Sequence, residues 1–378
     1  MQKFCECTED GYCKRFARVM AGRFREICAG INVDLGTAAA FREQWAREAA
    51  SESGITTQSP PYPGPPSPLL LVTDQAPGDT VVMTAAIYSL HKAYPGRYLT
   101  DVVSLYPEVF EHNPHVISSR SVSGAAKLHM HYPAIHQSNQ RGIHFMQGWC
   151  EHLGMALGHP VPLLTNRPHL YFNTPPFPTP VSDYWLVCSG GKRDLTNKLW
   201  GQHNYQQVTH FLKGKVGFIQ VGANADEHPR LDDVYNLVGR TTLRELFELV
   251  RRARGVVCGV SLLMHVAAAL DKPAIIIAGG REPVQWNAYP KQHYLHTVGM
   301  LPCSSPQGDR GVACWRSRTI PLGDNPTLDK DTCERPVDGT PTKLNKTILP
   351  ECMTMIKPET VADLILMCNR QYEHTSDS

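Results

Sequence analysis

Residues 255–270, GVVCGVSLLMHVAAAL, are the most apolar long stretch of the chain, and they decide its fold. The first part, 255–260, is typical of a buried strand, and 262–270 is typical of a buried helix. In open α/β sheets a strand runs into a helix in this way, and ligands bind beyond the carboxyl ends of the strands. Ser261 and His265 are the polar residues at this point.

Strand and helix patterns alternate on both sides of this stretch. In the second half of the chain they are predicted at 184–189, 203–214, 215–222, 241–253, 255–260, 262–270 and 273–280. Alternating elements with apolar strands predict a doubly wound parallel sheet. An earlier strand–helix–strand unit spans 69–104, and 143–157 has the pattern of a helix. The fold class is therefore α/β, with two Rossmann-like domains facing one cleft.

Composition shifts along the 378 residues predict the domain limits. Residues 51–68 contain six prolines, which is typical of a stiff linker without a core. We expect a Cys-rich helical module at 1–50, the Pro-rich linker at 51–68, Rossmann-like domains at 69–180 and 181–300, a Cys-rich insertion at 301–353, and a helix and tail at 354–378.

The overall charge argues against nucleic-acid or membrane partners. A net charge of +2 provides no long-range attraction to a polyanion, and the basic run at 251–254 is typical of a solvated helix end. The N-terminal residues lack the apolar core of a signal peptide, and no apolar run reaches the roughly 18 residues of a membrane span. We therefore expect a cytoplasmic protein.

Two segments of the second half can bind a phosphate. Ser261 is placed near a helix N-cap, where backbone N–H groups and the helix dipole favour an anion, and His265 lies one turn further on the same side. The alternative is that Ser261 only caps the helix and His265 is a satisfied core residue. Thr241 and Thr242 precede another helix, with Glu245 completing a capping box, and the same groups could hold a nucleotide.

Two further loops follow predicted strands. In CSGGKRDLTNKLW, 188–200, Gly190 permits close backbone approach and Lys198 can bind a diphosphate, although the spacing is not that of a P-loop. Asp79 lies in the first turn of the helix after the first strand. It either interacts with the helix dipole or acts as a general base at the cleft.

Taken together, these segments resemble glycosyltransferase family 9, the ADP-heptose-type heptosyltransferases of GT-B fold. The resemblance rests on GDTVVMTAAIYSLHKAYPG (78–96), TNKLW (196–200), LVGRTTLRELFELVRRARGVVCGVSLLMHVAAAL (237–270) and CMTMIKPETVADLI (352–365). It implies that Asp79 is the catalytic base and that Lys198 contacts the donor phosphates. It also implies that donor-side positions are occupied by Thr241, Thr242, Ser261, Met264 and His265.

The chain departs from the family at two positions. Where the family usually has Asp-Ser-Gly-x-Met-His, this chain has Val260 and Leu262 in place of Asp and Gly. A carboxylate that bonds sugar hydroxyls is thereby removed, while the phosphate-facing residues remain. We therefore expect a nucleotide-diphosphate sugar as donor, without identifying its sugar or base.

The resemblance implies inverting transfer of a sugar from this donor to an acceptor hydroxyl on a glycan, a protein or a small molecule. The acceptor would bind the domain at 69–180 and the donor the domain at 181–300, with no metal needed for the transfer step. Two alternatives stay open: a nucleotide-sugar epimerase of the same fold, and a catalytically inactive binding protein.

The twelve cysteines include two sets of four. In a reducing compartment, clustered cysteines favour metal over disulfides, and four thiolates suit Zn or Fe. The first set is Cys5, Cys7, Cys13 and Cys28, and the second is Cys303, Cys314, Cys333 and Cys352. The second segment also resembles the four-cysteine iron segment of some autotransporter heptosyltransferases. We expect a structural metal at each set, with reduced cysteines as the alternative.

Overall fold

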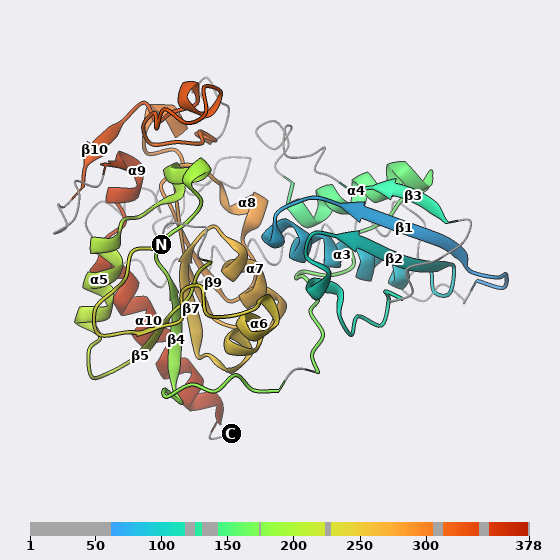
Figure 1. The fold of residues 1–378 in the computed structure, drawn as a ribbon, viewed down its shortest axis with the longest axis horizontal. Helices are drawn as coiled ribbons and strands as arrows, with labels where there is room; N and C mark the ends of the chain where they lie inside the picture. The colour runs from blue at the N-terminus through green and yellow to red at the C-terminus, as the bar shows by residue number, and fades with distance from the viewer. Residues whose placement is uncertain are drawn as a thin grey trace, which may run out of the picture.

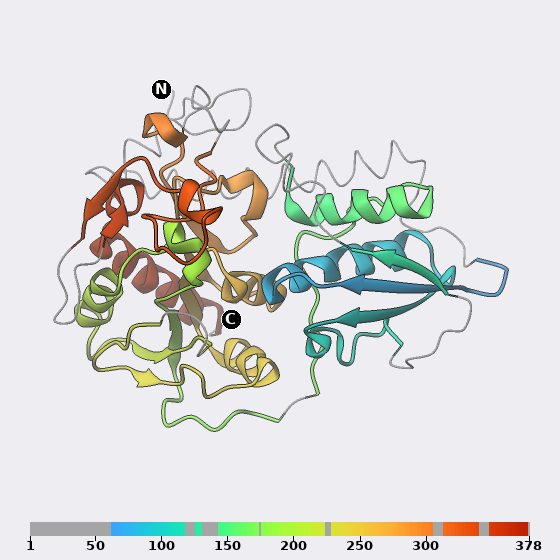
Figure 2. The same cartoon turned by 45° about the horizontal axis from the view of Figure 1, so that its top comes forward.

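The computed structural model describes residues 62–117, 125–130, 143–173, 175–223, 228–304, 313–339 and 348–376. These residues form two lobes that lie side by side (Figures 1 and 2). The predicted module at 1–50 and residues 51–61 of the predicted linker lie outside the described residues. Within the described ranges, no helix is both long and apolar enough to span a membrane.

The first lobe is a three-stranded parallel sheet with two long helices. Strand β1 (Ser67–Thr73) lies between β2 (Tyr98–Ser104) and β3 (Ala126–His129). Along β1, fully buried side chains alternate with more exposed ones, as expected for a strand with one face on the core. Helices α3 (Pro77–Ala93) and α4 (Phe145–Leu157) pack against each other and share a core with β1.

The second lobe contains a six-stranded sheet in the order β6-β5-β4-β7-β8-β9, with every neighbouring pair parallel. Its strands are β4 (Tyr184–Cys188), β5 (Gly217–Gln220), β6 (Tyr235–Asn236), β7 (Gly255–Gly259), β8 (Ala274–Gly279) and β9 (Gln292–His296). The apolar stretch 255–270 thus begins with β7, a central strand of this sheet. The α/β class with parallel sheets is confirmed.

The helices of this lobe are α5 (Gln202–Phe211), α6 (Leu243–Arg252), α7 (Leu262–Ala269) and α8 (Val284–Asn287), together with the 3-10 helix η4 (Arg193–Lys198). Helix α6 begins with the predicted capping box, because the Thr242 hydroxyl accepts from the Glu245 N–H and Glu245 bonds back to Thr242. Only Val260 and Ser261 separate β7 from α7, so the N-terminus of α7 lies at the carboxyl edge of the sheet.

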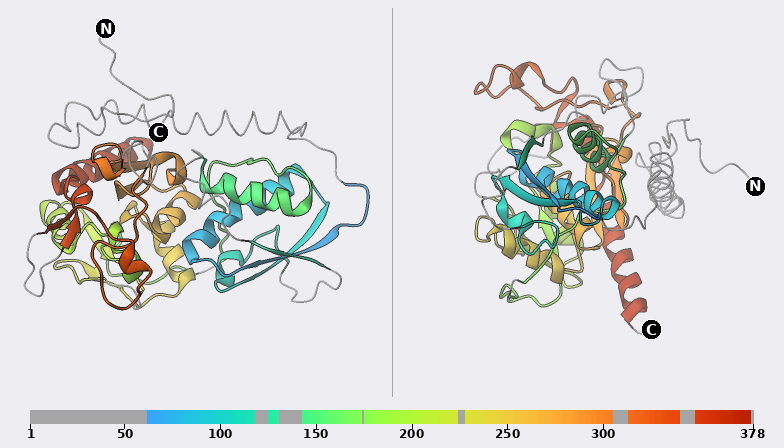
Figure 3. Two further views of the ribbon diagram at one scale, coloured as in Figure 1. Left: turned by 90° about the horizontal axis from the view of Figure 1, so that it is seen from above. Right: turned by 90° about the vertical axis from the view of Figure 1, so that its right-hand side faces the viewer.

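The chain after β9 returns along the second lobe (Figure 3). It contains η5 (Pro302–Ser304), η6 (Leu328–Lys330), β10 (Pro336–Asp338), β11 (Ile348–Pro350), α9 (Glu351–Thr354) and α10 (Pro358–Ser376). Helix α10 packs on α5. Two buried indoles anchor the return: Trp200 donates to the Ile356 carbonyl at 2.9 Å, and Trp185 to Asn369 Oδ1 at 2.8 Å.

Arg244 joins the two lobes. It belongs to α6 and is buried, yet its guanidinium donates to the carbonyl of Glu108, in η2 (Pro107–Phe110) of the first lobe, and to that of Tyr171 in the connecting segment. The guanidinium also lies 5.2 Å from the Phe172 ring centre. A buried cation held by both lobes fixes how they meet.

Acid is expected to destabilise this fold. Burial lowers the pKa of His293 and His296 from 6.5 to about 4, and burial followed by Lys198 lowers that of His265 to about 3. Between pH 6.5 and 4 the unfolded chain binds protons that the folded chain excludes. The free energy of unfolding should therefore fall as pH falls, by at most about 1.4 kcal/mol per pH unit for each histidine.

Urea midpoints measured at pH 7.5, 6 and 5 test this expectation. The midpoint should fall at each step, and His293→Asn should make the fall shallower. A midpoint that is independent of pH over this range would show that these imidazoles protonate without cost to the fold.

Candidate active site at the lobe junction

Asp79 lies where the two lobes meet. It is half-buried in the first turn of α3, whose N-terminus packs against α7 of the other lobe. Gly78 permits this approach: a Cβ there would lie 3.2 Å from Cδ2 of His265 and 3.4 Å from the Leu262 Cα. A side chain at position 78 would crowd the His265 ring, so glycine favours the close approach of Asp79 to the second lobe.

Ser261 and His265 stand on the opposite side of this contact. Ser261 is the N-cap of α7 in extended conformation, but its hydroxyl makes no capping hydrogen bond. The prediction that it only caps the helix therefore has no support in the geometry. His265 is buried and pairs with Tyr289, with Nδ1 and the phenolic oxygen 2.9 Å apart. Its strongly lowered pKa leaves the imidazole neutral at physiological pH.

Lys198 approaches the same place from η4. Its Nζ lies 2.7 Å from Oε1 of Glu282, and about a quarter of the side chain, 23%, remains exposed. Its backbone passes close to the end of β7, since a Cβ on Gly259 would lie 3.3 Å from the Lys198 carbonyl oxygen. Burial lowers the pKa of Lys198, whereas Glu282 and Asp79 act to raise it. Asp79 and Lys198, from different lobes, thus interact electrostatically.

Glu282 is a site residue that the sequence argument missed. Its side chain is 3% exposed, contacts Lys198 and Arg281, and accepts from Asn287 Nδ2 at 2.6 Å. Burial raises the pKa of this carboxyl, but Lys198 and Arg281 lower it by more, so the group is ionised. The available signal was position: Glu282 follows β8 at the carboxyl edge of the sheet, where ligands bind.

Of the other predicted donor residues, some lie at the carboxyl edge of the sheet and some have side chains with a structural role. Gly190 lies two residues after β4, at the edge that carries Lys198 and Ser261. Thr241 is half-buried before α6, and the Thr242 hydroxyl is used by the capping box. The Met264 side chain is fully buried in the core. The contacts therefore bring together Asp79, Lys198, Ser261 and His265, while Thr242 and Met264 have structural roles for their side chains.

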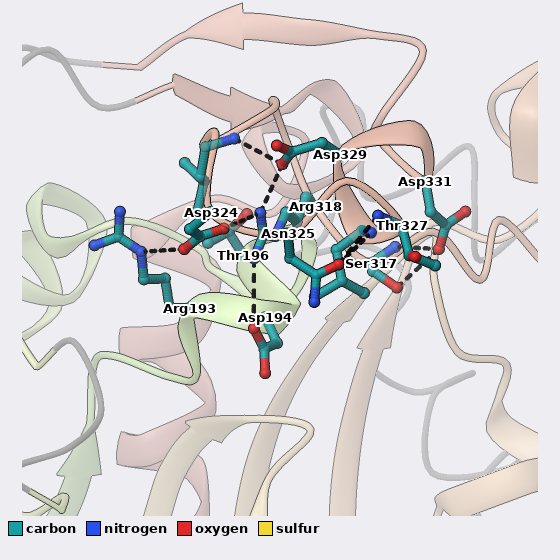
Figure 4. Close-up of polar contacts among 12 residues, drawn as sticks. Arg193, Asp194, Thr196, Ser317, Arg318, Asp324, Asn325, Thr327, Asp329 and Asp331 are labelled. Atoms are coloured by element: carbon teal, nitrogen blue, oxygen red, sulfur yellow. Dashed lines mark hydrogen bonds and ion pairs between the residues drawn. The ribbon is translucent and has the colours of Figure 1, made fainter.

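The segment after Cys314 holds η4 in place (Figure 4). Thr319 donates through its N–H to Thr196 Oγ1 at 3.0 Å and through its hydroxyl to the Thr196 carbonyl at 3.1 Å. Arg318 is fully buried, and its guanidinium pairs with Asp324 at 2.5 Å, with Asp329 at 2.6 Å and with Asp194 of η4 at 3.4 Å. These contacts hold Asp194 and Thr196, which precede Lys198 in the same short helix.

The second cysteine set is partly assembled. Cys303 and Cys314 hydrogen-bond through their side chains, which raises the pKa of Cys303 and lowers that of Cys314, and Cys333 and Cys352 are close enough to add to the shift at Cys303. Among the described residues, however, no group of three or more His, Cys, Asp or Glu side chains has the arrangement of a metal site. The first set, Cys5 to Cys28, lies outside the described residues.

A sequence-family comparison matches the region that contains Lys198, Ser261 and Glu282. Residues 165–308 match glycosyltransferase family 9 (heptosyltransferase). The matched residues include all six strands of the second lobe. The resemblance predicted from the sequence is confirmed.

Individual relatives of the family 9 domain are distant. Lipooligosaccharide heptosyltransferase 2 of Haemophilus influenzae is 26% identical over 98 residues, which are 23% of this chain and 28% of that protein. Among solved structures, the iron-containing dodecameric glycosyltransferase TibC from enterotoxigenic E. coli has a TM-score of 0.51 at 15% identity, over 81% of this chain and 77% of its own. E. coli ADP-heptose lps heptosyltransferase II has a TM-score of 0.47 at 14% identity, over 81% and 99%. The likeness to TibC shows a shared two-lobed fold.

Proposed function

We propose that the protein is an inverting glycosyltransferase that moves a heptose-like sugar from a nucleotide-diphosphate donor to an acceptor hydroxyl. The observation that carries the proposal is the packing of the first turn of α3, which holds Asp79, against the N-terminal part of α7, near enough to Lys198 for the Asp79 charge to raise its pKa. The carboxylate can act as the base. The cation and the helix N-terminus opposite it can stabilise the leaving diphosphate. The family 9 domain supports this choice of reaction.

The second lobe binds the donor. The N-terminus of α7 and the Lys198 ammonium favour the negative charge that grows on the diphosphate as it leaves. Asn197 Oδ1 and Asn287 Oδ1 are buried without a hydrogen-bond partner, and both residues adjoin the Lys198–Glu282 pair. Sugar hydroxyls can satisfy such acceptors. The proposed donor residues are Gly190, Lys198, Thr241, Thr242, Ser261, Met264 and His265.

The first lobe binds the acceptor. Asp79 takes the proton of the acceptor hydroxyl while its oxygen bonds to the anomeric carbon and the bond from that carbon to the diphosphate oxygen breaks. Attack from the side opposite the leaving group inverts the anomeric configuration. The neutral His265 adds no charge beside the base.

Incubation with a panel of nucleotide-diphosphate sugars and candidate glycan acceptors, followed by mass spectrometry, tests the proposal. A product heavier by one sugar, together with free nucleoside diphosphate, is expected. Affinity for a nucleotide sugar without turnover would instead identify a binding protein. A donor converted to its epimer, with no acceptor modified, would identify an epimerase.

We also propose that Cys303, Cys314, Cys333 and Cys352 hold a structural Zn or Fe. The donor set fits, because three of the four thiols are buried and the hydrogen bond with Cys303 lowers the pKa of Cys314, which favours the thiolate that a metal binds. TibC, which has a similar fold, contains iron, and this supports the proposal. The metal would fix the segment that clamps η4, without a part in the transfer step.

Cys333→Ser is expected to lower the metal content of the purified protein by one equivalent per chain and to lower its melting temperature. Elemental analysis and a melting curve provide the measurements. Cys368→Ser, at a buried cysteine of α10 outside the set, is the control and should retain the metal. Equal metal content in both variants would contradict the assignment.

A further inference from the structure

Glu282, the ion-pair partner of Lys198, also contacts Arg281 and Asn287. Oε1 of Glu282 faces the Lys198 ammonium at 2.7 Å and also contacts Arg281, while Oε2 accepts from Asn287. The carboxylate is almost entirely buried, whereas the ammonium is partly exposed. Because Arg281 and Asn287 hold this buried carboxylate in place, the carboxylate can in turn hold the Lys198 ammonium in one position.

Arg281 ties this cluster to the Cys-rich segment. Its Nε donates to the Arg316 carbonyl at 2.8 Å, and its guanidinium lies 4.5 Å from the Trp315 ring centre. Asn197, the neighbour of Lys198, donates two hydrogen bonds to carbonyls of the same segment: its backbone N–H to Ser317 at 3.1 Å and its Nδ2 to Arg316 at 3.4 Å. Lys198 is thus fixed at its backbone by this segment and at its ammonium by Glu282.

We propose that Glu282 is a positioning residue, whose buried carboxylate holds the Lys198 ammonium at the lobe junction and keeps it protonated for the donor diphosphate. This inference rests on the proposed function and adds a residue to it. The groups that face Lys198 are Glu282, Arg281, Asp79 and His265. Arg281 opposes protonation of Lys198, and the neutral His265 does not assist it, so the two carboxylates maintain it.

The side of Glu282 distinguishes its role from that of Asp79. Asp79 belongs to the first lobe and stands where the acceptor would bind, so its charge changes when it takes a proton. Glu282 belongs to the second lobe and is enclosed by Lys198, Arg281 and Asn287. Its charge therefore stays constant through the reaction, as a positioning group requires.

Glu282→Gln keeps the shape of the side chain and removes its charge. We expect kcat/KM for the donor to fall by about tenfold to a hundredfold, as for a misplaced binding group. Because Lys198 then loses its main counter-charge, its pKa should fall, and the loss of activity at high pH should begin at a lower pH. Glu282→Asp, which retains the charge, should restore the alkaline limb towards that of the wild type.

Lys198 can also be observed without any activity assay. The pH dependence of its acetylation by dilute acetic anhydride, followed by mass spectrometry, reports its protonation directly. The midpoint of labelling should move to lower pH in Glu282→Gln and not in the control Glu248→Gln. Glu248 is a matched control because it is equally buried and pairs with Arg251 at 2.6 Å on α6.

An unchanged labelling midpoint and an unchanged alkaline limb in Glu282→Gln would overturn the proposal, whatever its effect on melting. The labelling result stands even if no nucleotide sugar is turned over. Failure of the proposed function and failure of the positioning role are therefore separate outcomes.

Discussion

Asp79→Asn should lower the rate of sugar transfer by about 10²- to 10⁴-fold, the usual contribution of a general base. Asparagine has nearly the same shape and cannot accept the acceptor proton, so the chemical step is the one affected. Affinity for the nucleotide should be retained, because the diphosphate is held by Lys198 and α7 of the other lobe. Turnover measured with saturating donor, beside calorimetric titration with nucleoside diphosphate, separates the two effects.

Asp74→Asn is the matched control. Asp74 lies in the short loop between β1 and α3, five residues before Asp79, is exposed, and bonds only to the neighbouring Gln75 side chain among its described hydrogen bonds. Its replacement should leave turnover unchanged. If Asp79→Asn had wild-type turnover, Asp79 would not be the base, and the first lobe would have to supply another.

Lys198→Met is expected to reduce kcat/KM by about 10²- to 10³-fold, as when one preorganised donor to a developing anion is removed. Methionine fills similar volume without a charge. Unlike Asp79→Asn, this variant should also bind the nucleoside diphosphate more weakly, because Lys198 meets the diphosphate before and during bond cleavage. Glu282 keeps Arg281 and Asn287 as partners, so the variant should fold.

Lys192→Met serves as control, since Lys192 lies in the same loop and is exposed. Its effect on nucleotide affinity should be small. Equal losses in the two variants would mean that the loop contributes only diffuse positive charge. A melting curve on each variant excludes unfolding as the cause.

Much of the second lobe could be predicted because its apolar strands are buried on both faces. The stretch 255–270 became β7 and α7 within a residue of the expected limits. Strand β9 was not predicted, because QHYLH is polar in sequence although every one of its residues is buried. Its two histidines are kept neutral by burial, a property that no local pattern indicates.

The sequence predicted the site residues that follow single strands. It did not predict the contacts between loops that follow different strands. Asp79, Lys198 and Ser261 were found because each follows a strand in a recognisable loop. Glu282 was missed because its partner Lys198 lies 84 residues earlier, and only the sheet order β4-β7-β8 brings the two loops together. That the Ser261 hydroxyl does not cap α7 also required coordinates, since a serine at an N-cap normally bonds the helix.

A crystal structure of the protein with a nucleoside-diphosphate sugar tests the central claim most directly. We expect the diphosphate to lie between Lys198 Nζ and the N-terminus of α7, with the anomeric carbon facing the Asp79 carboxylate. A diphosphate bound away from Lys198, or a sugar turned from Asp79 with no other first-lobe group beside it, would contradict the account.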